Sequence, residues 1–164
     1  MYKTTENIDN ESNTISLTKA LSKAMTYCAR GEKCEQEVRE KLRLWRAAEE
    51  DIEAIIYQLV KEKFVDDKRY ARAFTSDKYR FNQWGRHKIA TMLTVKGISR
   101  ETIDEALTEI DEERYHATLV AAMTAKAKTL KGKTPYERQI ALYRFAASRG
   151  YENNLIQQVI ENEL

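Results

Sequence analysis

The chain has 164 residues, of which 33% are charged, and its formal net charge is +2. An apolar fraction of 42% is typical of a folded protein and argues against an intrinsically disordered one. No apolar run approaches the ~20 residues needed to cross a bilayer, and the N-terminal segment lacks the apolar centre of a signal peptide. We therefore expect a cytoplasmic protein.

The chain begins with a polar segment, residues 1–17, that we predict to be a disordered tail. From Thr18 onward, apolar residues recur with the 3.6-residue period of helices, without the alternation that is typical of strands. This pattern predicts nine helices, at residues 18–30, 34–46, 49–63, 67–81, 86–96, 100–110, 112–130, 135–149 and 152–163.

The predicted helices fall into three repeats. Val38–Leu59 aligns with Ile89–Ile110 at an offset of 51 residues, and a third copy follows at a further offset of 53, which places Gly97 on Gly150. A period of this size is typical of units that bury their apolar faces against one another. We predict an all-α fold of tandem three-helix repeats, at residues 18–65, 66–110 and 111–164.

Glycines and capping residues mark the junctions between the predicted helices. Five glycines fall at such junctions, where we expect the chain to turn with positive φ: Gly31, Gly85, Gly97, Gly132 and Gly150. Thr134, Pro135 and Glu137 form a capping box at the start of a helix. Ser99 is an expected N-cap, as is either Asp66 or Asp67.

Charge is distributed unevenly along the chain. Residues 78–100 carry six cations and no carboxylate, interleaved with aromatic residues, and residues 114–138 carry six cations against Glu137 alone. Residues 49–53 are acidic and stand at a predicted helix start, where the helix dipole favours them. Basic and aromatic side chains together suit phosphate contacts and base stacking, although a solvated helix surface would show the same charges.

No residue pattern points to catalysis. The two histidines lack a partner motif, the single Gly-Lys pair lacks the P-loop spacing, and Cys28 and Cys34 give no four-ligand zinc pattern. Helix carboxylates are expected to pair with a lysine one turn on, as Glu37 with Lys41. We predict no enzymatic activity, no cofactor and no metal. The tryptophans are either packing residues or anchors for a partner.

The segment from Phe64 to Phe74 resembles the signature of the RecX family of regulatory proteins, in which paired acidic residues precede an Arg-aromatic-Ala run. The matching positions are Asp66, Asp67, Arg69, Tyr70, Ala71 and Phe74. The Gly-basic helix start at Gly85 and the Lys-Gly-Ile ending at Gly97 also fit, and Arg149-Gly150-Tyr151 is similar to that ending. In the first repeat, Arg46-Ala47-Ala48 departs from the pattern, because it lacks the glycine.

The resemblance implies an elongated, curved array of repeats that binds the RecA recombinase, chiefly the filament that RecA forms on single-stranded DNA. Such proteins lie in the filament groove, bridge neighbouring protomers and limit filament growth. ATP hydrolysis, strand exchange and the co-protease activity of the SOS response fall as a result. We expect a monomer without a membrane partner, and we leave weak direct binding to DNA open.

We assign contact with the filament to the two basic windows. The first set comprises Lys78, Arg80, Trp84, Arg86, Lys88 and Arg100, and the second comprises Lys126, Lys128, Lys131 and Lys133. Two alternatives remain. A stand-alone helical DNA-binding protein predicts tight, salt-dependent DNA binding without RecA. A helical scaffold for an unrelated protein predicts neither effect.

Overall fold

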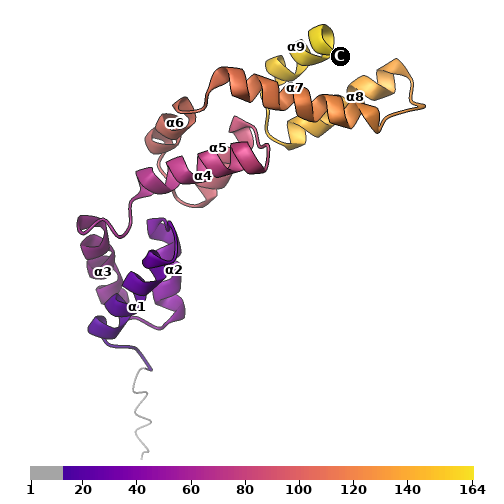
Figure 1. Ribbon diagram of the computed structural model, residues 1–164. Coiled ribbons are helices and arrows are strands. Elements are labelled where there is room, and N and C mark those ends of the chain that lie inside the picture. Colours follow the sequence, from indigo (N-terminus) through magenta and orange to yellow (C-terminus); the bar gives the residue numbers. More distant parts are fainter. Residues whose placement is uncertain (1–12) are drawn as a thin grey trace, which may run out of the picture.

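The computed structural model describes residues 13–164, and within this range the fold consists of nine helices and one isolated β-bridge. The helices are α1 (Leu17–Ala29), α2 (Glu35–Leu44), α3 (Glu49–Lys61), α4 (Asp67–Phe81), α5 (Arg86–Val95), α6 (Arg100–Thr108), α7 (Glu112–Lys128), α8 (Pro135–Ser148) and α9 (Asn153–Glu163). Figure 1 shows an elongated, curved array with α1–α3 at one end and α8 and α9 at the other. None of the described helices is long and apolar enough to span a membrane.

Side-chain caps fix where several helices begin. Five N-cap side chains accept a hydrogen bond from the backbone N–H three residues on: Ser16, Asp66, Ser99, Asp111 and Thr134. Each bond satisfies a donor that has no partner inside its helix. Glu137 completes the predicted capping box by accepting the N–H of Thr134 at 2.8 Å. These local signals explain why the helix ends lie within two residues of their predicted positions.

The helices pack in groups of three. α1, α2 and α3 contact one another, α4, α5 and α6 do the same, and α8 packs against both α7 and α9. We call α1–α3 the first unit, α4–α6 the second unit and α7–α9 the third unit. The repeat boundaries that we predict from the sequence, at residues 18–65, 66–110 and 111–164, remain a prediction.

Two hydrophobic cores support the three units. The first unit buries a core of its own, which includes Leu42 of α2 and Ile52 of α3. The second and third units share one core, in which Leu93 of α5, Leu119 of α7 and Ile156 of α9 are fully buried. Because burial of apolar surface is the main favourable term in folding, the second and third units form one packed body.

Glycine geometry differs from the prediction at one junction. Gly97, Gly132 and Gly150 have the expected positive φ, but Gly85 has a φ of −83° and is the N-cap of α5. A Cβ on Gly85 would lie 2.4 Å from the carbonyl carbon of Gly150, so a close backbone approach requires glycine there. Conversely, Arg46 adopts a φ of 63° at the junction that lacks a glycine, which is an uncommon conformation for a residue with a Cβ.

Of the predicted disordered tail, residues 1–17, the first twelve residues lie outside the described part of the chain. Beyond that point, Ile15 donates its backbone N–H to the carbonyl oxygen of Arg46 at 3.1 Å and forms a parallel bridge with Ala47. The side chain of Ile15 also packs against the core of the first unit. The segment just before α1 is therefore attached to the α2–α3 turn.

Candidate binding surface

The N-terminus of α5 is docked on the α8–α9 turn. Gly85 donates its N–H to the carbonyl oxygen of Arg149 at 2.7 Å, and His87 donates to that of Gly150 at 2.9 Å. A Cβ on Gly150 would lie 2.4 Å from the backbone nitrogen of Lys88, so the contact depends on the missing side chains. This joint holds the second and third units together and positions the basic residues at the start of α5.

Arg86 stands at the centre of a polar network in this joint. Its guanidinium lies 4.1 Å from the centre of the Tyr115 ring and pairs with Glu112 and, at 3.1 Å, with Glu152. The Tyr115 hydroxyl accepts the N–H of Arg86 at 3.0 Å and donates to Glu152 at 2.8 Å. Burial disfavours the charged guanidinium, but the hydrogen bonds that it donates to both carboxylates outweigh burial and raise the pKa of Arg86.

The predicted contact role of Arg86 therefore needs correction. Its side chain is only 20% exposed, and two carboxylates of the third unit neutralise its charge inside the molecule. A guanidinium that is held in this way by a fork of hydrogen bonds has little capacity left for an external partner. We assign Arg86 to the joint between the units and leave it out of the candidate surface.

Two lysines from different helices meet over the ring of Trp84. The Nζ atom of Lys78 lies 4.9 Å from the ring centre and that of Lys88 lies 4.5 Å from it. Among the described residues, the lysines that form ion pairs are Lys68 and Lys96 instead. We call Lys78, Trp84 and Lys88 the Trp84 cluster. Its two uncompensated charges and its half-buried ring suit an anionic partner.

Arg80 shares a hollow with Arg114, which belongs to neither predicted set. The hollow has a volume of about 520 Å³, lies between α4 and α7, and is lined by Tyr79, Arg80, Gln83, Arg114, Ala117, Thr118 and Ala121. Its lining contains no carboxylate. Arg114 opens the second basic window of the sequence, but only the packing of α7 beside α4 brings it to Arg80.

The second predicted set is divided between two places. Lys126 lies 5.8 Å from the centre of the Phe145 ring, which Arg149 also approaches at 4.7 Å. The other three members are exposed at the end of α7 and in the loop that follows: Lys128, Lys131 and Lys133. Arg100 of the first set stands apart at the start of α6, where it pairs with Asp104 at 3.0 Å.

The acidic pair of the signature links the second unit to the first. Asp66 caps α4, and Asp67 accepts the N–H of Glu35 at 2.9 Å. Arg69 pairs with Glu32 of the α1–α2 loop at 2.6 Å. Burial raises the pKa of the Asp67 carboxyl, because its charged form is removed from water. These signature residues maintain the joint between two units.

Glu37 provides a further link between the first and second units. It pairs with Lys96 at 2.9 Å and accepts a hydrogen bond from the Tyr70 hydroxyl at 3.3 Å. The predicted pairing of Glu37 with Lys41 is wrong, because a lysine from the next unit reaches the carboxylate. The Nζ atom of Lys41 lies 5.6 Å from the centre of the Tyr27 ring instead.

The remaining signature residues pack inside the molecule. Ala71 is fully buried, and Tyr70, which is 7% exposed, stacks on Phe74 with ring centres 6.0 Å apart. The rings of Phe74 and Trp84 in turn meet edge to face, with their centres 6.3 Å apart. A Cβ on Gly97 would lie 2.4 Å from the side-chain oxygen of Gln36. Through Phe74, the signature residues pack against Trp84 and hold it in place.

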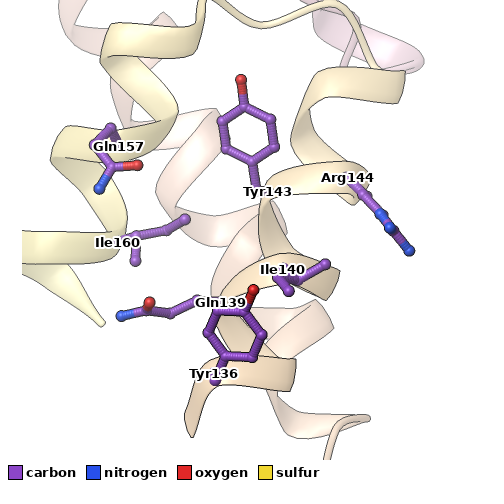
Figure 2. A pocket seen from close by; sticks show the side chains of 7 residues that line it. All are labelled: Tyr136, Gln139, Ile140, Tyr143, Arg144, Gln157 and Ile160. Carbon is purple, nitrogen blue, oxygen red and sulfur yellow. The ribbon is translucent and has the colours of Figure 1, made fainter.

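A different hollow lies on the third unit, between α8 and α9 (Figure 2). It has a volume of about 250 Å³ and is lined by Tyr136, Gln139, Ile140, Tyr143, Arg144, Gln157 and Ile160. Its lining holds no carboxylate, thiol or imidazole, and Arg144 points away from α9. Apart from the phenol groups of Tyr136 and Tyr143, the hollow offers apolar and amide contact surface.

Both cysteines are buried free thiols. Burial raises the pKa of Cys34 to about 11, so this thiol stays protonated and weakly reactive at neutral pH. Cys34 serves the fold, since its Sγ lies 3.7 Å from the carbonyl oxygen of Lys96 in the next unit. Within residues 13–164, no group of His, Cys, Asp and Glu side chains is arranged to hold a metal ion.

Comparison with known proteins places these features in a family. Residues 20–59 match the family model described as RecX, first three-helix domain, and residues 66–107 match RecX, second three-helix domain. The chain is 32% identical to the regulatory protein RecX of Clostridium botulinum strain Alaska E43, over 99% of this chain and 79% of that protein. It is 36% identical to that of Clostridium beijerinckii, over 79% of this chain and 61% of the relative.

Solved structures share the fold. A crystal structure of a regulatory protein RecX superimposes with a TM-score of 0.83 at 22% identity, over 90% of this chain and 72% of the other. RecX from Lactobacillus salivarius gives a TM-score of 0.81 at 21% identity, over 88% of this chain and 94% of the other. At these identities the similarity concerns the architecture, a curved array of three-helix units.

Proposed function

Because this chain belongs to the RecX family of regulatory proteins, we propose that it is a mainly negative regulator of the RecA recombinase. It binds the filament that RecA forms on single-stranded DNA, lies in the filament groove and limits filament growth. ATP hydrolysis, strand exchange and SOS co-protease activity fall because all three require an intact filament.

The observation that carries this proposal is the Trp84 cluster. Lys78 and Lys88 hold two uncompensated charges over one aromatic ring, and the hollow beside α4 adds Arg80 and Arg114. Among residues 13–164 these four cations form no ion pair, and such cations suit a partner that presents phosphates or carboxylates in a groove. An aromatic ring at the centre supplies the apolar contact that binding hot spots require.

The shape of the molecule also suits this role. The second and third units share a core, so the Trp84 cluster and the basic end of α7 are held on one body. An elongated array of this kind contacts more than one protomer of a filament. Two modest contacts then act as one strong contact, because the second forms at a high effective concentration.

RecA from the same source supplies the test. We expect titration of this protein into RecA on single-stranded DNA to inhibit ATP hydrolysis well below one molecule per RecA. The Lys78→Gln/Lys88→Gln variant should require roughly tenfold more protein, since it removes two charge contacts that are each worth up to about 1 kcal/mol. The control is Lys19→Gln/Lys61→Gln, which removes two exposed lysines of α1 and α3 and should match the wild type.

The same titration distinguishes the alternatives. Equal inhibition by the wild type and by Lys78→Gln/Lys88→Gln would refute the assignment of the contact to the Trp84 cluster. No inhibition, combined with tight, salt-sensitive binding to DNA, would favour a stand-alone DNA-binding protein. If neither activity is observed, a scaffold for an unrelated protein becomes the better interpretation.

A further inference from the structure

The first unit also carries a group of cations gathered around aromatic rings, separate from the Trp84 cluster. A hollow of about 530 Å³ opens between α1 and α2, and it is lined by Ser22, Lys23, Thr26, Tyr27, Arg30, Lys33, Lys41 and Trp45. Four of these residues are cationic and none is acidic. We propose that this hollow binds single-stranded nucleic acid. The site extends the proposed function without depending on it, since it lies on a different unit from the Trp84 cluster.

The cations of this hollow converge on its two aromatic rings. Tyr27 and Trp45 meet edge to face, with ring centres 6.0 Å apart. The Nζ atom of Lys23 lies 4.7 Å from the centre of the Trp45 ring. Those of Lys33 and Lys41 lie 5.0 Å and 5.6 Å from the centre of the Tyr27 ring. Three ammonium groups from α1, α2 and the loop between them are thus gathered around one aromatic pair.

The cations of this hollow form no ion pair with the described residues. Within residues 13–164, neither the three lysines nor Arg30 forms an ion pair, although carboxylates serve other cations of the same unit. Arg39 pairs with Glu53 at 2.7 Å, and Arg43 pairs with Glu49 at 2.9 Å. Glu37, the carboxylate one turn before Lys41, is bound instead by a lysine of the second unit. Like charges gathered in this way repel one another, and a bound polyanion relieves that repulsion.

The combination of groups selects the class of ligand. Lysine ammonium groups bind phosphates as point charges, without selecting a base sequence. The half-buried Tyr27 and Trp45 rings become stacking surfaces for unpaired bases when the lysines above them turn outward to the phosphates. A duplex does not present unpaired bases. A volume of about 530 Å³ lies within the range of pockets that hold small organic ligands, so one base fits in the hollow while the phosphates on either side of it along the strand meet the four cations. An acidic peptide would use the cations but not the rings.

Direct binding to labelled oligo-dT, measured by fluorescence anisotropy without RecA, tests the site on the full chain. We expect the logarithm of the binding constant to fall with the logarithm of salt concentration with a slope of about −3, which corresponds to four phosphate contacts on a single strand. Lys23→Gln/Lys33→Gln/Lys41→Gln should bind about tenfold or more weakly and reduce that slope by about 2.

The aromatic part of the site has its own readout. Trp45→Leu should weaken binding roughly tenfold and leave the salt slope unchanged, because it removes a stacking surface and no charge. In a Trp84→Phe background, Trp45 is the one remaining tryptophan, and its fluorescence should be quenched when oligo-dT stacks on it. The matched control, Lys19→Gln/Lys61→Gln, should bind as the wild type does.

Three outcomes would overturn the proposal. The first is equal binding of oligo-dT by the wild type and the triple lysine variant, with circular dichroism showing both folded. The second is competition by thymidine monophosphate as effective as that of oligo-dT at the same nucleotide concentration, which would indicate a site for free nucleotides. The third is equal competition by polyglutamate, with no change in Trp45 fluorescence. Because the assay contains no RecA, none of these results bears on inhibition of RecA.

Discussion

The role of a single cation in this protein depends on whether a carboxylate of another unit reaches it. Arg86 meets Glu112 and Glu152 of the third unit. Lys78 and Lys88 instead lie over the ring of Trp84, and Lys78 also lies 5.4 Å from the centre of the Phe74 ring. All three belong to one basic window of the sequence. Arg86 therefore contributes to stability, and the two lysines remain accessible to a partner.

Replacing Arg86 tests whether its ion pairs with Glu112 and Glu152 stabilise the protein. We expect Arg86→Met to lower the free energy of unfolding by about 2 kcal/mol, because it leaves Glu152 half-buried beside Tyr115 without its cation. Arg86→Lys should recover only part of the loss, since an ammonium group does not reproduce the forked hydrogen bonds. Urea denaturation measures both effects.

Arg100→Met is the matched control for Arg86. It also breaks an arginine–carboxylate pair, but that pair is exposed and lies within one helix turn. The expected cost is about 0.5 kcal/mol or less. If both variants lost the same free energy, the network around Arg86 would not stabilise the joint.

At the scale of elements, the two joints between units repeat one arrangement. The N-cap of the second helix in one unit faces the turn before the third helix of the next unit. Cys34 Sγ lies 3.7 Å from the carbonyl oxygen of Lys96, and the Gly85 nitrogen lies 2.7 Å from that of Arg149. The sequence offsets of 51 and 53 relate these pairs. The array thus repeats the position of the contact, although a thiol makes it in the first joint and a backbone N–H makes it in the second.

The segment before α1 makes a similar contact on the first unit. Ile15 donates to the carbonyl oxygen of Arg46 at 3.1 Å, as His87 donates to that of Gly150 at 2.9 Å. Arg46 and Gly150 occupy equivalent turns by the same offsets. Ile15 therefore takes, on the first unit, the place that the second helix of another unit takes elsewhere in the array.

Glycine-to-alanine variants test the close backbone approach at the joint. Gly132→Ala introduces a Cβ at positive φ into open space, and should cost about 1 kcal/mol from backbone strain. Gly85→Ala, at negative φ, brings only the steric conflict with Gly150. Gly150→Ala combines both, and we expect it to cost roughly 3 kcal/mol or more. Thermal and urea denaturation rank the three variants.

Comparing the three variants separates two reasons for glycine at these turns, which are the close backbone approach at the joint and the backbone strain of a positive φ. If Gly85→Ala cost as little as a surface substitution, the joint would adapt freely and the 2.4 Å approach would not restrict the residue. If Gly132→Ala cost as much as Gly150→Ala, backbone strain alone would explain the glycines, and the docking of α5 on the α8–α9 turn would contribute little.

At the scale of the whole molecule, the two cores divide the array unequally. The second and third units share one core, whereas the first unit has its own. The joint between the first and second units inserts Cys34 into the shared core but is otherwise largely polar, with Glu37 bound by Lys96 and Tyr70, and Asp67 bound by the N–H of Glu35. Polar contacts of this kind contribute less to cooperative folding than shared apolar burial does.

We therefore expect two cooperative units in unfolding. Leu42→Ala in α2 should lower the stability of the first unit by about 2–5 kcal/mol, and Leu119→Ala in α7 should do the same for the body formed by the second and third units. Hydrogen exchange in increasing urea, read by mass spectrometry, would show each loss confined to its own core. Equal loss of protection in α1 and α9 for both variants would mean that the array unfolds as one.

Local features of this protein were predictable from the sequence because they depend on neighbours along the chain. The capping box at Thr134, the Ser99 cap and the period of apolar residues concern contacts within one helix turn. The offsets of 51 and 53 residues also relate the positions that meet at the two joints. The basic window at residues 78–100 contains Lys78 and Lys88. Their positions along the chain did not predict that both would lie over the ring of Trp84.

Contacts between units followed no local rule. The sequence favoured Lys41 as the partner of Glu37, but Lys96 binds it across the joint. It placed Arg86 among the contact residues, and third-unit carboxylates enclose it. The cations around Tyr27 and Trp45 form no basic window in the sequence, because glutamates lie between them along the chain. The sequence by itself determined the helices, their order and the family. Only the tertiary structure decided which charges are neutralised, because ion pairing depends on distance in space and not on distance along the chain.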